Sequence, residues 1–274
     1  MRMALRVYEN GRLVYYGGKG ASPDYWADHW EKRINPGWSE RACKGILSEY
    51  YEETFSKWLP REGRILEAGC GKGQVVIALR ARGYEVEGID FSPKTVEYVK
   101  SLVPEAPIHV GDVRNLNCPD ARFRAYISLG VVEHFQEGPQ GALAEAARVL
   151  QPDGIIIISV PRLNPLRRLK AAFGFYTGKN NGDFYQYAFT CNEFSALMAQ
   201  AGFEIMEVRC YSVPKGLSDE IAVFDFLQRK NKISPALHQK LNRSMLATRL
   251  FSHMMLFVGR KKAVNKPSAP RSQF

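Results

Sequence analysis

A glycine-rich turn and the acidic residues around it have the types and spacing expected for chemistry on a bound ligand. The turn follows an apolar run and reads Gly69-Cys70-Gly71-Lys72-Gly73. Glycines at alternate positions let a backbone turn tightly and approach a ligand closely. Asp90 and Asp112 follow the next two apolar runs, where strands are expected to end. Because open α/β sheets bind ligands at the carboxyl ends of parallel strands, we expect these residues to face one site.

The charge and spacing of these residues indicate the type of ligand. Glu67 precedes the turn and is expected to face it, so a phosphate would be repelled there and a cationic ligand attracted. The dinucleotide pattern GxGxxG requires glycine where Gln74 stands. Asp90 lies 21 residues after Gly69, where an acid binds both hydroxyls of an adenosine ribose. Asp112 is then placed to accept a hydrogen bond from the adenine amine, so an adenosine-bearing cation is favoured.

His134 is the candidate catalytic residue. It follows the fourth expected strand and stands next to Glu133. A neutral imidazole at this place could act as a general base whose pKa is near the working pH. The alternative is a structural histidine that anchors the loop by a hydrogen bond and does no chemistry. The sequence leaves both roles open.

The elements that must position these residues alternate as strands and helices. This alternation predicts an α/β fold, with a doubly wound, mostly parallel seven-stranded sheet and helices on both faces. The seven expected strands share short apolar runs bounded by glycine, proline or polar residues. They cover residues 64–68, 84–89, 108–110, 125–129, 154–160, 203–210 and 251–258.

Residues 1–60 are expected to form an N-terminal hairpin and a helical cap. Asn10-Gly11 is the strongest two-residue turn signal for such a hairpin. Helices are expected over 23–33 and 39–58. An aromatic stripe on the first of these, formed by Tyr25, Trp26 and Trp30, is expected to pack in the core, as such stripes usually do.

Residues 61–262 are expected to form the main domain. Two helical insertions interrupt it, at 161–189 and at 214–250, and the second is expected to contain two helices. Residues 263–274 are rich in proline, serine and lysine and are expected to be a disordered basic tail.

Five motifs together resemble the class I S-adenosylmethionine-dependent methyltransferases of the small-molecule branch, similar to methyltransferase type 11 and 23 domains. They are ILEAGCGKG (65–73), GIDFSP (88–93), GDV (111–113), SLGVVEHF (128–135) and PDGIIIISVP (152–161). The resemblance implies a Rossmann-like methyltransferase fold, with S-adenosyl-L-methionine as cofactor. It places one set of residues around that cofactor: Gly69, Gly71 and Gly73 at the methionine part, Asp90 at the ribose, Phe91 against the adenine, Asp112 with Val113 at the adenine amine, and Leu129 near the sulfonium.

The resemblance implies methyl transfer to a hydroxyl or amine of a small-molecule, sugar or lipid-like acceptor. Nucleic acid is not expected, because the Asn/Asp-Pro-Pro-aromatic motif of those enzymes is missing from 128–134. The Glu133-His134 pair is similar to quinone-pathway O-methyltransferases, some of which add an acid three residues earlier to hold a metal. Gly130 stands there, so no metal is expected. Two alternatives stay open: a nucleotide- or NAD-dependent enzyme on a similar sheet, and a non-catalytic S-adenosylmethionine-binding module.

Charge and cysteine content predict where in the cell the protein is located. The 274 residues include 38 Lys and Arg against 28 Asp and Glu, and the excess lies in 162–182 and 260–274, each with cations and no acid. Five scattered cysteines and the lack of a signal sequence or apolar span predict a cytoplasmic protein. Leu166, Leu169 and Phe173 alternate with cations at helical spacing. This pattern predicts either a lid on the active site or a weak peripheral contact with the anionic inner face of a membrane.

Overall fold

A seven-stranded sheet forms the centre of the protein, as expected. The computed structural model describes residues 5–17, 21–31, 37–178 and 182–263. The strand order is β5-β4-β3-β6-β7-β10-β9, with parallel pairing except at β10, which is antiparallel to both neighbours. The strands are β3 (Ile65–Ala68), β4 (Val86–Asp90), β5 (Ile108–Val110), β6 (Phe123–Leu129), β7 (Leu150–Pro161), β9 (Phe203–Tyr211) and β10 (Met254–Lys261).

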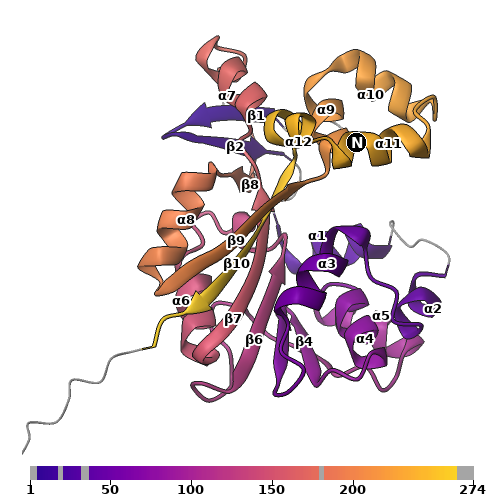
Figure 1. Ribbon diagram of the computed structural model, residues 1–274, viewed down its shortest axis with the longest axis vertical. Coiled ribbons are helices and arrows are strands. Elements are labelled where there is room, and N and C mark those ends of the chain that lie inside the picture. The colour runs from indigo at the N-terminus through magenta and orange to yellow at the C-terminus, as the bar shows by residue number, and fades with distance from the viewer. Residues whose placement is uncertain (1–4, 18–20, 32–36, 179–181, 264–274) are drawn as a thin grey trace, which may run out of the picture.

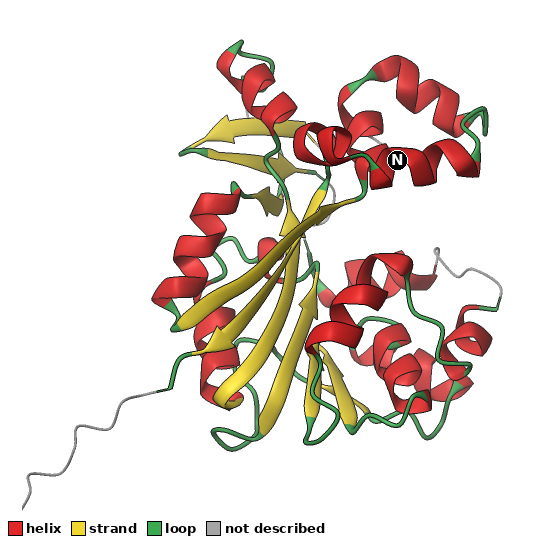
Figure 2. Cartoon of the chain, viewed as in Figure 1, coloured by secondary structure: helices red, strands yellow, loops and turns green. Residues whose placement is uncertain are grey.

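Helices cover both faces of this sheet (Figures 1 and 2). One core cluster joins the sheet to α2 (Trp38–Cys43), α3 (Glu49–Trp58), α4 (Gln74–Ala81) and α5 (Pro93–Leu102). The other joins it to α6 (Gln140–Val149) and α8 (Cys191–Gln200). The central strand β7 is buried on both faces, which explains its continuous apolar run. The expected capping box is present, since the Thr190 hydroxyl accepts a hydrogen bond from the Glu193 amide.

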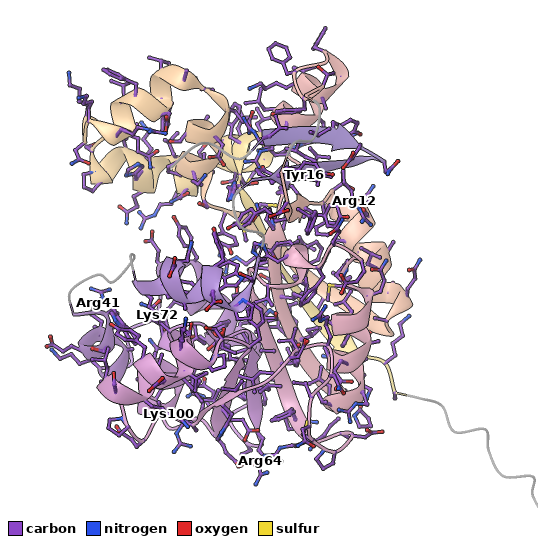
Figure 3. The ribbon with its side chains drawn as sticks, turned by 180° about the vertical axis from the view of Figure 1, so that it is seen from behind. Arg12, Tyr16, Arg41, Arg64, Lys72 and Lys100 are labelled. Carbon is purple, nitrogen blue, oxygen red and sulfur yellow. The ribbon has the colours of Figure 1, made fainter. Side chains whose placement is uncertain are left out.

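A second, three-stranded sheet lies beyond the carboxyl ends of the parallel strands. Its order is β1-β2-β8, with β1 (Leu5–Glu9), β2 (Arg12–Tyr16) and β8 (Phe184–Ala188). Asn10 and Gly11 both have positive φ, of 50° and 80°, as the predicted hairpin turn requires. In Figure 3, Arg12 and Tyr16 mark this sheet at one end of the molecule, and Arg64, which precedes β3, marks the opposite end.

Two helix predictions need correction. The expected helix over 39–58 is split into α2 and α3 because Gly45 adopts a left-handed φ of 72° between them. The segment 214–250 contains four helices rather than two. They are α9 (Val213–Glu220), α10 (Ala222–Arg229), α11 (Pro235–Arg243) and α12 (Met245–Phe251).

Serine N-caps explain in part why the segment 214–250 forms four helices. The Ser234 hydroxyl accepts a hydrogen bond from the Leu237 amide at the start of α11, and the Ser244 hydroxyl accepts one from the Ala247 amide at the start of α12. The insertion at 161–189 contains a helix, α7 (Pro165–Ala172), as well as strand β8. The expected disordered tail lies outside the described residues, apart from residue 263.

Candidate active site

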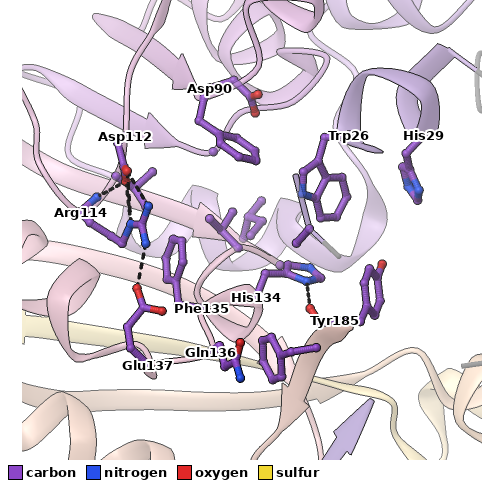
Figure 4. A pocket seen from close by; sticks show the side chains of 18 of the residues that line it. Trp26, His29, Asp90, Asp112, Arg114, His134, Phe135, Gln136, Glu137 and Tyr185 are labelled. Carbon is purple, nitrogen blue, oxygen red and sulfur yellow. Dashed lines mark hydrogen bonds and ion pairs between the residues drawn. The ribbon is translucent and has the colours of Figure 1, made fainter. Parts of the chain in front are cut away.

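A cavity of about 520 Å³ opens at the carboxyl ends of β4, β5 and β6. It is covered by α1 (Pro23–Glu31) and by β8 of the second sheet. Figure 4 shows two sides of it: Asp112, Arg114 and Glu137 lie on one side, and Trp26 and Tyr185 on the other. A volume of this size is typical of small-molecule sites.

Asp90 ends β4 and lines this cavity. Its Oδ2 atom accepts a hydrogen bond of 2.9 Å from the Gly71 amide, and its Oδ1 atom accepts one of 3.0 Å from the Ser92 amide. Burial raises the pKa of Asp90, and the two amide hydrogen bonds oppose that change. The carboxylate is therefore held rigidly between the glycine turn and the start of α5, with lone pairs left for a ligand.

Asp112 lies just beyond β5 and carries an ion pair that sequence analysis did not anticipate. Arg114 donates to both of its carboxylate oxygens, with an Nε–Oδ1 distance of 3.0 Å and an Nη2–Oδ2 distance of 2.7 Å. The same guanidinium reaches Glu137 at 2.8 Å and lies over the ring of Phe135. Hydrogen bonding from Arg114 lowers the pKa of Asp112, against a smaller effect of burial. Asp112 is thus ionised and fixed at the cavity wall.

The glycine turn contributes to the site mainly by close packing. Gly69 lines the cavity, whereas Gly71 and Gly73 are not among its described lining residues. A Cβ atom on Gly71 would lie 2.8 Å from the Trp30 ring, and one on Gly73 would lie 2.2 Å from Cδ1 of Ile108. Both glycines also have positive φ. They are needed so that Trp30 of α1 and Ile108 of β5 can approach the turn closely.

Glu67, which precedes the glycine turn, is buried. It is 4% exposed, does not line the cavity, and its Oε2 atom accepts a hydrogen bond of 3.1 Å from the Val76 amide in α4. Burial raises the pKa of Glu67 to about 8, although the Val76 amide opposes this. At neutral pH its carboxyl is therefore protonated, and the negative charge that we expected from Glu67 comes from other residues.

His134 lies in a short 3-10 turn after β6, against the aromatic side of the cavity. Its Nδ1 atom is 2.7 Å from the carbonyl oxygen of Tyr185. A carbonyl can only accept, so Nδ1 carries the proton and Nε2 keeps its lone pair. Burial lowers the pKa of His134 to about 4, against the opposing effect of this hydrogen bond. The imidazole is neutral at physiological pH.

Aromatic residues of α1 and β8 are the part of the site that sequence analysis missed. Trp26, His29 and Trp30 line the cavity, and the core packing expected for this stripe is wrong. The ring centroids of Trp26 and His134 are 4.9 Å apart, as are those of Tyr185 and His134. Helical spacing of aromatics was the available signal, but it is the same for a core helix and for one that covers a cavity.

The lining residues fit a cationic, adenosine-bearing ligand. They include three carboxylates, of Asp90, Asp112 and Glu137, against one guanidinium, of Arg114. Phe91 is 37% exposed and presents an apolar ring at the same end, and Val113 and Leu129 complete this wall. S-adenosylmethionine, with its sulfonium and no phosphate, matches this charge. Within the described ranges, no group of three or more His, Cys, Asp or Glu is arranged to hold a metal.

Comparison with known proteins points to a methyltransferase family. Residues 66–158 match the methyltransferase domain family. The chain is 30% identical over 173 residues to a probable S-adenosylmethionine-dependent methyltransferase of Mycolicibacterium smegmatis, covering 61% of this chain and 64% of that protein. It is 33% identical over 116 residues to a ubiquinone biosynthesis O-methyltransferase of Alkalilimnicola ehrlichii, covering 40% of this chain and 47% of that protein. The chain thus spans about half to two thirds of the length of these curated relatives.

Solved structures share the fold at low identity. A TehB-like S-adenosylmethionine-dependent methyltransferase of Corynebacterium glutamicum superimposes with a TM-score of 0.53 and 21% identity, covering 88% of this chain and all of that one. A geranyl diphosphate C-methyltransferase of Streptomyces coelicolor superimposes with a TM-score of 0.54 and 13% identity, covering 89% of this chain and 100% of that one. These two similarities support the fold class.

Proposed function

We propose that this chain, which belongs to the class I S-adenosylmethionine-dependent methyltransferases, transfers a methyl group to a hydroxyl or amine of a small-molecule, sugar or lipid-like acceptor. One observation carries the proposal: a single cavity brings the carboxylates of Asp90 and Asp112 together with a neutral His134. Carboxylates suit an adenosine-bearing cation, and an unprotonated imidazole suits an acceptor that must lose a proton.

The cofactor is S-adenosyl-L-methionine, and we assign its binding to the charged side of the cavity. Asp90 would accept hydrogen bonds from the ribose hydroxyls, because two of its lone pairs remain after the Gly71 and Ser92 amides are satisfied. Phe91 would pack on the adenine, and Asp112 would accept from the adenine amine. When bound, the cofactor supplies a methyl group that its sulfonium has already activated.

His134 would act at the acceptor. Its Nε2 atom can accept a hydrogen bond from an acceptor hydroxyl or amine and take the proton as the new bond to carbon forms. A pKa of about 4 makes the imidazole a weak base, but it also keeps the imidazole unprotonated at working pH. A weak base suffices here, because an oxygen or nitrogen becomes strongly acidic as it is alkylated. The rest of the rate enhancement would come from alignment and exclusion of water.

The acceptor side of the cavity favours an apolar or aromatic acceptor. Its described lining residues include Trp26, Phe184 and Tyr185, and the ion-paired Asp112, Arg114 and Glu137 lie on the opposite side (Figure 4). The ubiquinone O-methyltransferase among the relatives supports a hydroxyl acceptor of this kind. No described helix has both the length and the hydrophobicity to cross a bilayer. Separately from methyl transfer, we propose a weak peripheral contact with an anionic membrane, which the cations and the lack of acids in residues 162–182 support.

Thermal unfolding with and without ligand tests the cofactor assignment. A ligand at about 100 times its Kd stabilises a protein by roughly 2.7 kcal/mol, so S-adenosylmethionine should raise the melting temperature by several degrees. NAD should not. Glu62→Ala, an exposed change before β3, serves as the control that keeps the effect, and Asp90→Ala should lose most of it. A shift with NAD and none with S-adenosylmethionine would overturn the proposal in favour of a dinucleotide enzyme.

A further inference from the structure

Several large apolar side chains are exposed at the end of the molecule formed by α7 and α12. Leu169, Phe173 and Phe175, on α7 and the turn after it, are 56%, 73% and 67% exposed. Met245 and Leu246 of α12 are 88% and 67% exposed. The two helices pack against each other, and Figure 1 shows both at the end of the molecule beyond the carboxyl ends of the parallel strands. We call these five residues the apolar tip.

The apolar tip does not cover the active site. None of its residues belongs to the described lining of the cavity, which is covered by α1 and β8 instead. The lid expected from the amphipathic pattern of 162–179 is therefore wrong for α7. Its apolar side faces solvent, and exposed aromatic clusters of this kind mark interaction surfaces.

Arg167 explains why α7 keeps this orientation. Its side chain is fully buried, with Nη2 2.9 Å from Asp219 and Nε 3.0 Å from Glu220 in α9. It also donates to the Arg162 carbonyl and contacts Nδ1 of His253, which precedes β10. These bonds anchor the first turn of α7 to the rest of the domain, so the exposure of the apolar tip is a fixed feature of the fold.

The helices of the apolar tip and the adjoining α11 carry exposed cations. Arg168, Arg243 and Arg249 are exposed, and within the described ranges none of the three is paired with a carboxylate. The segments 161–178 and 235–251, which hold α7, α11 and α12, contain no Asp or Glu at all. Exposed phenylalanines beside unpaired arginines match the chemistry of a surface with anionic headgroups over an apolar interior.

We propose that the apolar tip and its arginines dock on an anionic lipid bilayer, with Phe173 and Phe175 entering the headgroup region. This inference rests on the membrane contact within the proposed function and identifies the surface that makes it. Tyr176 and Leu163 attach the α7 segment to the sheet β1-β2-β8, whose β8 supplies Phe184 and Tyr185 to the cavity. Docking would thus place the acceptor side of the cavity close to the membrane, which suits an amphiphilic acceptor.

Co-sedimentation with vesicles tests this surface. Wild-type protein should sediment with phosphatidylglycerol-containing vesicles at low salt, stay in solution with pure phosphatidylcholine, and be released at high salt. Phe173→Ser/Phe175→Ser and Arg243→Glu/Arg249→Glu should each reduce the bound fraction by about five-fold or more. Leu102→Ser, at a 46% exposed leucine that ends α5, is the matched control and should bind as wild type does.

Three outcomes would overturn the inference. One is equal recovery in solution with both kinds of vesicle, and another is unchanged binding by both double variants. The third is a wild-type dimer that Phe173→Ser/Phe175→Ser converts to a monomer, because the apolar tip would then cover a second copy of the chain. The thermal shift with S-adenosylmethionine is measured on the same samples, so loss of membrane binding with an intact shift separates this inference from the methyl-transfer proposal.

Discussion

His134 and Tyr185 are joined by a 2.7 Å hydrogen bond between the imidazole Nδ1 atom and the Tyr185 backbone carbonyl oxygen, across 51 residues of sequence. His134 comes from the turn after β6 of the main sheet, and Tyr185 from β8 of the second sheet. Because the acceptor is a backbone atom, it fixes the tautomer whatever side chain stands at 185. The second sheet therefore orients the candidate base as well as covering the cavity.

Replacing His134 distinguishes a base from an anchor. If Nε2 takes the acceptor proton, His134→Gln should lower turnover by about 100-fold and leave S-adenosylmethionine affinity unchanged. His109→Gln, on the exposed side of β5, is the control. Since the neutral form exists above the pKa of about 4, wild-type turnover should show no loss attributable to this residue between pH 7 and 5. An unchanged rate with a lowered melting temperature would assign His134 a structural role.

Asp90 should be essential for cofactor affinity. Asp90→Ala should weaken S-adenosylmethionine binding by about 1.5–3 kcal/mol, the usual cost of removing hydrogen bonds to a charged acceptor. The substitution also leaves the Gly71 and Ser92 amides without their partner, so Asp90→Asn, which keeps one oxygen, should lose less. Isothermal titration calorimetry on both folded variants measures the difference. Equal S-adenosylmethionine affinity in wild type and Asp90→Ala would show that the ribose does not bind at Asp90.

The buried carboxyl of Glu133 should make the protein less stable as pH rises. Burial raises its pKa to about 8, and its Oε2 atom has no hydrogen-bond partner among the described residues. The folded state thus keeps a proton that an unfolded glutamate releases near pH 4.3, and this stability is present at low pH and lost as pH rises through 8. The slope is at most about 1.4 kcal/mol per pH unit for each such group.

Glu133→Gln isolates this effect. Between pH 6.5 and 8 the free energy of unfolding should fall less steeply in the variant than in wild type. The fall that remains in the variant includes the contribution of Glu67, whose pKa is also raised. His134 has a lowered pKa and opposes the two acids only at pH values from about 4 to 6.5, below this window. Urea unfolding at several pH values measures the slope, with Glu62→Gln as control. Identical slopes in Glu133→Gln and wild type would contradict the assignment.

Arg167 should be far more important for stability than its neighbour Arg168. Arg167→Met leaves Asp219 and Glu220 partly uncompensated in a buried environment, at a cost of about 3–5 kcal/mol. For a chain of this size that corresponds to a melting temperature lower by about 6–20 °C. Arg168→Met, on the exposed side of the same helix, should change stability by less than about 0.5 kcal/mol. Similar melting temperatures for the two variants would show that the buried pairs do not hold α7.

The sequence alone was enough to predict the parallel sheet and most of the charged half of the site. Hydrophobic periodicity and glycine spacing are local signals, and they located β3 to β7 within a few residues, except for the earlier start of β7. Because every parallel strand ends at the same edge, Asp90 and Asp112 had to meet there once the strands were known. The split of 39–58 at Gly45 was less visible, since a single glycine also occurs within helices.

Tertiary structure decided which side of each element faces the ligand. Gly71, Gly73 and Glu67 are not among the described lining residues of the cavity, and they pack instead against Trp30, Ile108 and α4. These contacts join separate elements of the chain, so no local sequence pattern predicts them. The aromatic stripe of α1 covers the cavity because α1 packs on α5 and places Trp26 against the ring of His134. The strand β8 covers it because β8 pairs with β2, from far earlier in the chain. Long-range pairing of this kind depends on which faces are buried together, and so only the folded chain shows it.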